Sequence, residues 1–276
     1  MSVGRYAWSL RRRVLGPTRV VTKEHVDALR RSSALERGSR RHVGALLLRE
    51  LALGPPRRAH IRVGEASIEL GGNRDFPVDW AAFLEIYGRE AYAASYSGAR
   101  VLDIGAHKGY FGAYALTCGA STVVSFEPAT RNYDALARAA EPFGDRWLVR
   151  NAALSATSGT DLLLLDRTSW AHSLVHVKRP AGEQIVETVT LADALSELPE
   201  AGSRTIVKID AEGSECDILA RPEPLEAIDL LIVEWHEMAP CTRSELTQIV
   251  EIAGLRLRSD PTGPMRFARE RSHVPL

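Results

Sequence analysis

Three carboxylates occur within six residues in the segment Lys208-Ile209-Asp210-Ala211-Glu212-Gly213-Ser214-Glu215, directly after a short apolar run. Like charges this close repel one another, so such a cluster usually holds a cation, a proton or a basic partner. Lys208 provides a local counter-charge, and Glu215 is accounted for as an acid at the start of a helix. Asp210, still inside the apolar run, is not accounted for in this way. Asp210 and Glu212 are therefore candidate catalytic residues.

A second acidic segment, Glu234-Trp235-His236-Glu237, follows the apolar residues 230–233. His236 is a candidate general base, because the pKa of an imidazole lies near neutrality. A rival mechanism gives Asp210 and Glu234 to a Mg²⁺ ion, which lowers the pKa of a bound hydroxyl group. Both readings stay open, and the sequence leaves the metal content of the site undecided.

A glycine-containing loop precedes these segments in Val101-Leu102-Asp103-Ile104-Gly105-Ala106-His107-Lys108-Gly109. A strand followed by such a turn lets the backbone approach a ligand closely. The loop lacks the middle glycine of the dinucleotide fingerprint G-x-G-x-x-G, so a pyrophosphate would lose its usual close contact. The carboxylate of Asp103 suits a cationic amino-acid ligand better than a phosphate.

Glu127 ends the next apolar run, TVVSF, and precedes Pro128. An acid at the end of the second strand is the usual acceptor for the two hydroxyls of a ribose. The strand, loop, helix, strand and acid together predict an adenosine-containing ligand without a pyrophosphate. The loop 166–176 adds Trp170, His172 and Ser173 as weaker candidates for an acceptor pocket.

An alternation of strands and helices must position these side chains. It predicts strands at 100–104, 122–126, 147–151, 205–210 and 229–235, and helices at 110–118, 130–140, 191–198, 214–219 and 242–253. Such alternation indicates a parallel sheet covered on both faces. Two further strand-like runs lie within 160–190, and residues 255–259 and 265–269 are expected to form a closing hairpin.

The N-terminal part differs from this pattern. Apolar spacing predicts helices at 25–35, 41–53 and 78–95, the last interrupted at Gly88, and a β-ribbon at 61–70. We expect residues 1–97 to form an arm that acts as a lid or dimerisation element, and residues 98–276 to form the catalytic domain.

Charge is distributed unevenly along the 276 residues, although 35 basic and 35 acidic side chains cancel. The first 60 residues hold 14 basic and 4 acidic side chains, whereas the remainder holds 21 and 31. A basic arm joined to an acidic body makes a homodimer formed through the arm more plausible than a nucleic-acid tether. No apolar stretch is long enough to span a membrane. Three cysteines without C-x-x-C spacing argue against a disulfide scaffold and a zinc site, and fit a reducing cytoplasm.

The order of motifs resembles the FkbM family of S-adenosylmethionine-dependent methyltransferases. The resemblance covers roughly residues 83–237 and rests on VLDIGAHKGYF, VVSFEPATRNYDAL, NAALSATSG, TLADAL, IVKIDAEGSECDIL and LLIVEWH. It implies a Rossmann-like class I methyltransferase fold, a mostly parallel seven-stranded sheet, and S-adenosylmethionine as cofactor. It most often implies methylation of a hydroxyl on a sugar or another natural product.

The resemblance also assigns residues to the cofactor and the acceptor. The residues implied around the cofactor are Asp103, Gly105, Ala106, His107, Gly109, Glu127, Pro128, Asn151, Ala152 and Asp210. Those implied near the methyl group and the acceptor are Asp210, Glu212, Glu234 and His236. The alternatives are methylation of a nitrogen, a carbon or a carboxylate of a small molecule, and an RNA methyltransferase that uses the basic arm. The acidic body argues against the RNA alternative, because it repels a polyanion.

Overall fold

The computed structural model describes residues 27–29, 32, 35, 38–41, 43–45, 58–71, 75–200, 204–258 and 263–269. Residues 27–29, 38–41 and 43–45 are helical. The rest of the helices expected at 25–35 and 41–53, and most of the basic arm, lie outside the described residues.

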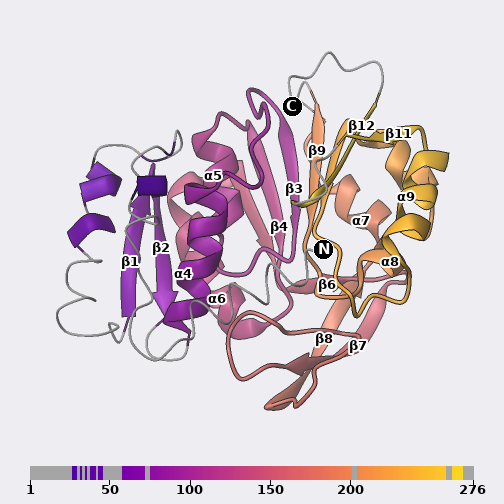
Figure 1. The fold of residues 1–276 in the computed structure, drawn as a ribbon, viewed down its shortest axis with the longest axis horizontal. Coiled ribbons are helices and arrows are strands. Elements are labelled where there is room, and N and C mark those ends of the chain that lie inside the picture. The colour runs from indigo at the N-terminus through magenta and orange to yellow at the C-terminus, as the bar shows by residue number, and fades with distance from the viewer. Residues whose placement is uncertain are drawn as a thin grey trace.

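A seven-stranded sheet forms the centre of the molecule (Figure 1). Six strands run in one direction and β12 runs opposite to them, in the spatial order β11-β12-β10-β9-β3-β4-β5. Their bounds are β3 Arg100–Ile104, β4 Thr122–Phe126, β5 Trp147–Arg150, β9 Thr205–Ile209, β10 Leu230–Val233, β11 Leu255–Leu257 and β12 Met265–Arg269. The mostly parallel sheet and its closing hairpin are confirmed.

Helices cover both faces of this sheet, which explains why its inner strands are continuous apolar runs. On one face lie α5 (Tyr110–Thr117) and α6 (Thr130–Ala140), and on the other lie α7 (Leu191–Ser196), α8 (Glu215–Ile218) and α9 (Arg243–Ile252) (Figure 1). Two buried apolar clusters fill the two interfaces. Short 3₁₀ helices span Glu141–Arg146 and Glu223–Ala227.

The β-ribbon and the following helix pack on the α5 and α6 side. The ribbon pairs β1 (Arg58–Val63) with β2 (Ala66–Gly71), as expected. Helix α4 (Phe76–Phe83) begins earlier than predicted, with a proline in its first turn, and continues as a π-helix (Leu84–Gly88). It ends at Gly88, and residues 91–95 are not helical. These elements share one apolar core with β3 and α5, while the domain boundary at residue 97 stays a prediction.

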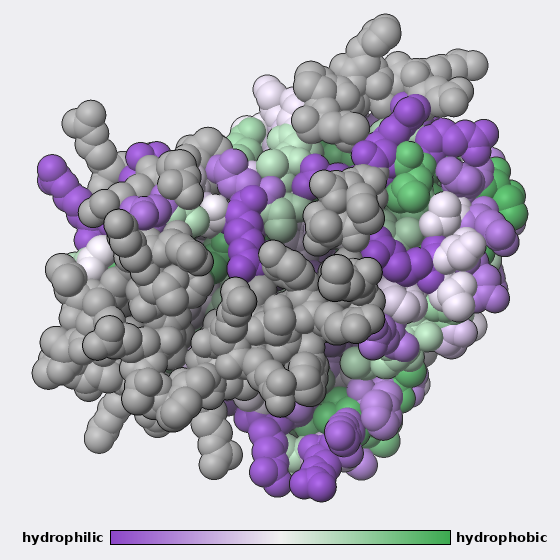
Figure 2. Space-filling view, in the orientation of Figure 1, coloured by the Kyte–Doolittle hydropathy of each residue, from purple (hydrophilic) through white to green (hydrophobic). Residues whose placement is uncertain are grey.

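A second, three-stranded sheet lies beyond the carboxyl edge of the first (Figure 1). The two strand-like runs of residues 160–190 form β7 (Gly159–Leu165) and β8 (Gly182–Val189), which pair antiparallel. Strand β6 (Ala152–Leu154) pairs with β8 and was not foreseen. Exposed large apolar side chains are few among the described residues. On the face in Figure 2, green hydrophobic residues lie scattered among hydrophilic ones, as on ordinary protein surfaces.

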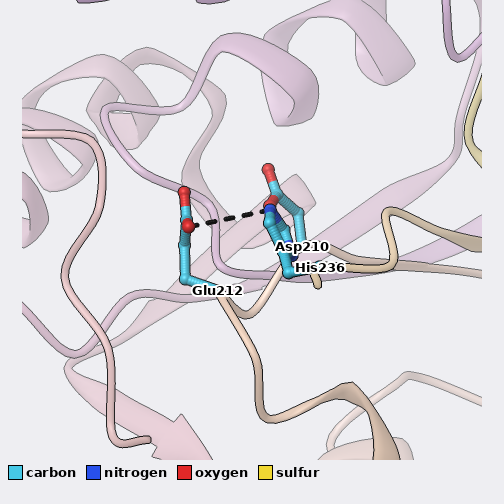
Figure 3. Close-up of side chains that lie close together, drawn as sticks. All are labelled: Asp210, Glu212 and His236. Atoms are coloured by element: carbon cyan, nitrogen blue, oxygen red, sulfur yellow. Dashed lines mark ion pairs between the residues drawn. The ribbon is translucent and has the colours of Figure 1, made fainter. Parts of the chain in front are cut away.

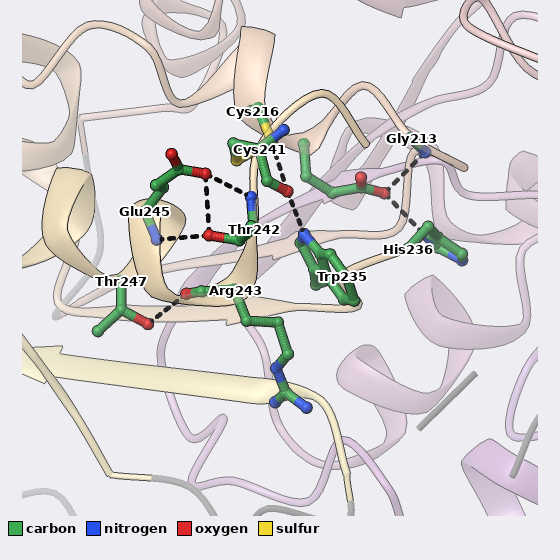
Figure 4. Close-up of a disulfide and its surroundings, with 10 residues drawn as sticks. Gly213, Cys216, Trp235, His236, Cys241, Thr242, Arg243, Glu245 and Thr247 are labelled. Atoms are coloured by element: carbon green, nitrogen blue, oxygen red, sulfur yellow. Dashed lines mark hydrogen bonds and ion pairs between the residues drawn. A yellow bond between two sulfur atoms is a disulfide. The ribbon is translucent and has the colours of Figure 1, made fainter. Parts of the chain in front are cut away.

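The sequence argues against a disulfide scaffold, yet two of the three cysteines form one disulfide. Cys216, in α8, and Cys241, after β10, form a disulfide, because the fold brings these two distant segments together (Figure 4). Cys118 is free. The argument from cysteines for a reducing compartment therefore loses its basis. Within the described residues, no helix is both long and apolar enough to cross a membrane.

Candidate active site

Four neighbouring parallel strands end in register at the carboxyl edge of the large sheet. Ile104 of β3 pairs with Phe126 of β4 and with Ile209 of β9, which pairs in turn with Val233 of β10. The next residues along these strands are the predicted site residues Glu127, Gly105, Asp210 and Glu234. Open α/β sheets bind ligands at this edge, where the chain order reverses.

One pocket of about 1000 Å³, part of it open to solvent, lies above these strand ends. It joins the glycine loop to the acidic segments, as the sequence predicts. The predicted residues that line it are Gly105, Ala106, His107, Glu127, Pro128, Ala152, Asp210, Glu212 and Glu234. Five acidic side chains and a single lysine face this pocket among the described residues that form it.

The glycine loop passes close to the start of the segment after β9. Gly105 has a φ of +73°, and a Cβ placed on it would overlap the carbonyl oxygen of Asp210. Only glycine combines that backbone conformation with so close an approach. His107 also has a positive φ, and its ring lies against Tyr110. Burial lowers the pKa of His107 well below its usual value, so its ring is neutral.

Glu127 lies at the floor of the pocket and is buried. Its carboxylate accepts hydrogen bonds from the backbone N–H of His107, at 2.8 Å, and of Ala129, at 3.0 Å. Burial raises the pKa of Glu127 to about 7, against the lowering effect of these bonds. The carboxylate is thus fixed in position and titrates near neutrality.

Four predicted residues do not line the pocket and instead support its walls. Asp103 is fully buried beneath the loop, and Gly109 packs against Trp147. The amide of Asn151 donates to the carbonyls of Glu127 and Pro128, at 2.9 Å each, which holds that turn. The fourth, His236, lies next to the carboxylates of the acidic segment that follows β9.

Lys208 links the glycine loop to the acidic cluster. Its ammonium group donates to the carbonyls of Gly105, at 2.8 Å, and Ile104, at 3.2 Å. It also lies 3.3 Å from Asp103 and 3.7 Å from Asp210. Although burial would lower the pKa of Lys208, Asp103 and Asp210 raise it above its usual value. Lys208, the counter-charge expected from the sequence, is therefore a buried cation that holds the ends of β3 and β9 together.

His236 is surrounded by three carboxylates, two of which, Asp210 and Glu212, are drawn in Figure 3. Its Nδ1 lies 2.7 Å from Oε1 of Glu215, and its Nε2 lies 3.7 Å from both Asp210 and Glu212. Burial alone would lower the pKa of His236, but Glu212, Glu215 and Asp210 raise it well above the usual value. His236 therefore favours the imidazolium form, which has no free nitrogen lone pair to accept a proton. This geometry does not favour His236 as the general base.

Two pocket residues were missed because they come from outside the sheet. Glu85, on the π-helix, lines the pocket, and burial together with Glu234 and Asp210 raises its pKa to about 8. Tyr92 donates its hydroxyl hydrogen bond to Oε2 of Glu234 at 2.8 Å. Burial and Asp210 raise the pKa of Glu234. For Glu85, the signal in the sequence was a single acidic residue within the apolar run AAFLEIYG.

The loop 166–176 covers the acidic side of the pocket. Trp170, His172 and Leu174 line it, as the sequence suggested for the first two. Ser173 is buried and donates to the backbone carbonyl of Glu212 at 2.7 Å, so it fixes the loop to the acidic segment. Glu212 itself has a φ of +47°.

Lys108, the basic neighbour of His107, does not face the pocket. It is buried and pairs with Asp79 of α4 at 2.6 Å. Asp79 also accepts hydrogen bonds from the backbone of Gly71 and the hydroxyl of Ser169. Lys108 therefore ties the ribbon, α4 and the covering loop to the glycine loop.

Known proteins resemble this chain at the level of the family and the fold. Residues 103–252 match the methyltransferase FkbM domain. No curated protein matches the chain. Two similar solved structures are the N,N-8-amino-8-demethyl-D-riboflavin dimethyltransferase of Streptomyces davawensis and the fibrillarin of Aeropyrum pernix with bound S-adenosylmethionine.

The likeness to these two structures is distant. The dimethyltransferase is 14% identical, with 70% of this chain and 57% of that chain covered and a TM-score of 0.40. The fibrillarin is 11% identical, with 63% and 66% covered and a TM-score of 0.37. The match to the family model spans more than half of the sequence, and the sheet order and pocket agree with it. The chain belongs to the FkbM family of S-adenosylmethionine-dependent methyltransferases.

Proposed function

We propose that this methyltransferase transfers the methyl group to a hydroxyl oxygen of a small molecule, such as a sugar or another natural product. The observation that carries the proposal is the continuity of the glycine loop with the carboxylates of Glu234, Asp210 and Glu85 in one pocket. Carboxylates placed beside the methyl-donor site can accept the proton that a hydroxyl loses.

The pocket residues fit S-adenosylmethionine. The left-handed turn at Gly105 holds the loop against the end of β9 at the pocket, and the fixed carboxylate of Glu127 suits the hydroxyls of a ribose. The acidic lining suits a cationic donor. When bound, the cofactor supplies an electrophilic methyl group on a sulfonium.

The protein then has to position the acceptor and take up its proton. Alignment of acceptor and donor is worth up to ~7–11 kcal/mol. We assign the proton to Glu234, because the hydroxyl of Tyr92 holds its Oε2 at 2.8 Å and leaves Oε1 for the acceptor. The covering loop, through Trp170 and His172, encloses the acceptor and excludes water. An enclosed, acidic pocket favours a small molecule over RNA.

The test is methyl transfer from labelled S-adenosylmethionine to a panel of alcohols, phenols, glycosides, amines and carboxylic acids, with products identified by mass spectrometry. We expect methyl ethers, and a loss of ~100- to 10,000-fold in kcat for Glu234→Gln. Binding of S-adenosylhomocysteine should be unchanged in this variant. Glu183→Gln, an exposed change on β8, is the matched control. Products methylated on nitrogen, carbon or carboxylate would refute the proposal.

The arm and the quaternary structure belong to the same proposal. We assign residues 1–97 to a lid or dimerisation element, and 98–276 to the catalytic domain. The packing of the ribbon and α4 against α5 supports a fixed role beside the pocket. Sedimentation of the full chain and of a chain that begins at residue 55 tests whether a homodimer depends on the arm. The cytoplasmic location expected from the sequence stays a prediction.

A further inference from the structure

We infer that Asp210, Glu212 and His236 form a binding site for one hard divalent cation, Mg²⁺ or Mn²⁺. One ligand atom from each of these residues lies within 4.8 Å of the others. Figure 3 shows the three side chains pointing into the same space from the ends of β9 and β10. Asp210 and Glu212 also line the pocket.

The distances suit an octahedral cation after a small closure. Nε2 of His236 lies 3.7 Å from Oδ1 of Asp210 and 3.7 Å from Oε2 of Glu212. Neighbouring ligands of an ion with bonds of about 2.1 Å lie about 3 Å apart. Each of these two pairs therefore has to approach by less than about 1 Å. The side chains have room for this, because Asp210 is 29% exposed.

A second observation comes from Glu215, which is not one of the three ligands. It is fully buried, and its Oε1 lies 2.7 Å from Nδ1 of His236. A metal-binding histidine usually has such a carboxylate on its other ring nitrogen, which orients the ring. The Oε2 atom of Glu215 has no hydrogen-bond partner among the described residues. Its Oε1 also accepts from the backbone N–H of Gly213 at 3.1 Å, so only one oxygen of this buried carboxylate is left open to a further positive charge.

The excess of acidic over basic side chains around the site also favours a bound cation. Besides the three ligands, the carboxyl groups of Glu215 and Glu234 lie around the site, and Lys208 is the one lysine or arginine among the described residues that line the pocket. Lys208 is already paired with Asp103 as well as Asp210. The two carboxylates suit Mg²⁺ or Mn²⁺, and none of the three ligands is a thiolate, which would select a softer metal. The ion would replace the proton on Nε2.

A cation bound at this site would also take part in the proposed methyl transfer. A hydroxyl group bound to it would have a lowered pKa and would be held beside the methyl donor. This role rests on the proposed function, whereas binding of the cation does not. The site therefore has to be tested by binding, with no acceptor present.

The test is titration of the metal-stripped full chain with MnCl₂, followed by the electron paramagnetic resonance signal of free Mn²⁺. We expect saturation at one ion per chain, competition by MgCl₂, and at least tenfold weaker binding in Glu212→Gln and His236→Gln. Glu215→Gln should weaken binding by about 10- to 100-fold through the orientation of His236. Asp217→Asn, an exposed change on α8, is the control and should bind as the wild type does.

Binding of S-adenosylhomocysteine, measured by calorimetry, shows that each variant is folded. The inference is overturned if Mn²⁺ does not saturate at one ion, or if Glu212→Gln and His236→Gln both keep full affinity. The outcome is separate from that of the proposed function. Saturable Mn²⁺ binding with methylation on nitrogen would retain the cation site and refute the hydroxyl acceptor.

Discussion

The carbonyl oxygen of Asp210 occupies the space that a side chain on Gly105 would need. The end of β9 therefore touches the cofactor loop at a residue without a side chain. This contact couples the predicted cofactor side and acceptor side of the pocket, because both residues line it. Lys208 strengthens the same junction through the carbonyl of Gly105.

Gly105→Ala tests this junction. The alanine side chain would push the loop away from Asp210 and would strain a backbone with a φ of +73°. Strain of this kind costs about 1–3 kcal/mol, so we expect S-adenosylhomocysteine to bind at least about tenfold more weakly. Calorimetry measures the affinity. Gly182→Ala on β8, where a Cβ has ordinary contacts, should bind normally. Equal affinity in both variants would contradict the prediction.

The affinity for the cofactor should depend on pH through Glu127. Its pKa is raised to about 7, so the carboxylate is mostly protonated at pH 6 and mostly ionised at pH 8. Only the ionised form accepts hydrogen bonds from two ribose hydroxyls. We therefore expect the affinity for S-adenosylhomocysteine to fall by up to about tenfold from pH 8 to pH 6.

Glu127→Gln is the control for this dependence. The amide does not titrate, so the variant should bind more weakly at pH 8 and should show little change down to pH 6. Calorimetry at four pH values measures both proteins. An unchanged pH profile in the variant would assign the dependence to another group.

Much of the site follows from a simple rule of parallel sheets. Glu127, Asp210 and Glu234 are the first residues after buried apolar strands, and such strands end at one edge. Their convergence could be predicted without coordinates. The role of Asn151 could not, because strand position says nothing of whether a side chain faces the ligand or the backbone of Glu127.

Glu85, Tyr92 and the disulfide depend on tertiary packing. Glu85 comes from a helix whose last turns widen into a π-helix, which sequence periodicity does not reveal. Tyr92 reaches Glu234 across 142 residues. Cys216 and Cys241 lie on segments whose proximity is set by the sheet order. The charge state of His236 likewise depends on three acids from a separate segment.

Glu85 should make the protein less stable as pH rises. Burial and neighbouring acids raise its pKa in the folded chain to about 8, above 4.5 in the unfolded chain. Between these values the unfolded chain releases a proton that the folded chain keeps, so unfolding becomes more favourable with increasing pH. Glu85→Gln lacks this effect and should be more stable by ~1–3 kcal/mol at pH 8.5, with a smaller difference at pH 5.

Thermal unfolding in the presence of a chelator measures this difference, since a bound cation would mask the repulsion. Glu183→Gln, an exposed change of the same type, should leave the melting temperature within experimental error at both pH values. A stability gap that is equal at pH 5 and pH 8.5 would show that Glu85 does not titrate in this range.

The disulfide should stabilise the loop that carries His236. Cys241 lies beyond this loop, and its carbonyl accepts a hydrogen bond from Trp235 Nε1 at 2.9 Å (Figure 4). The bond closes a loop with a sequence separation of 25, which corresponds to about 3 kcal/mol. The double variant Cys216→Ser, Cys241→Ser should therefore melt roughly 5–10 °C lower than the oxidised wild type.

A dithiol reductant serves as the control. It should lower the melting temperature of the wild type by the same amount and leave that of the double variant unchanged. Cys118→Ser should behave as the wild type does. If the reductant lowers the melting temperatures of the wild type and the double variant equally, the stabilisation does not come from this disulfide.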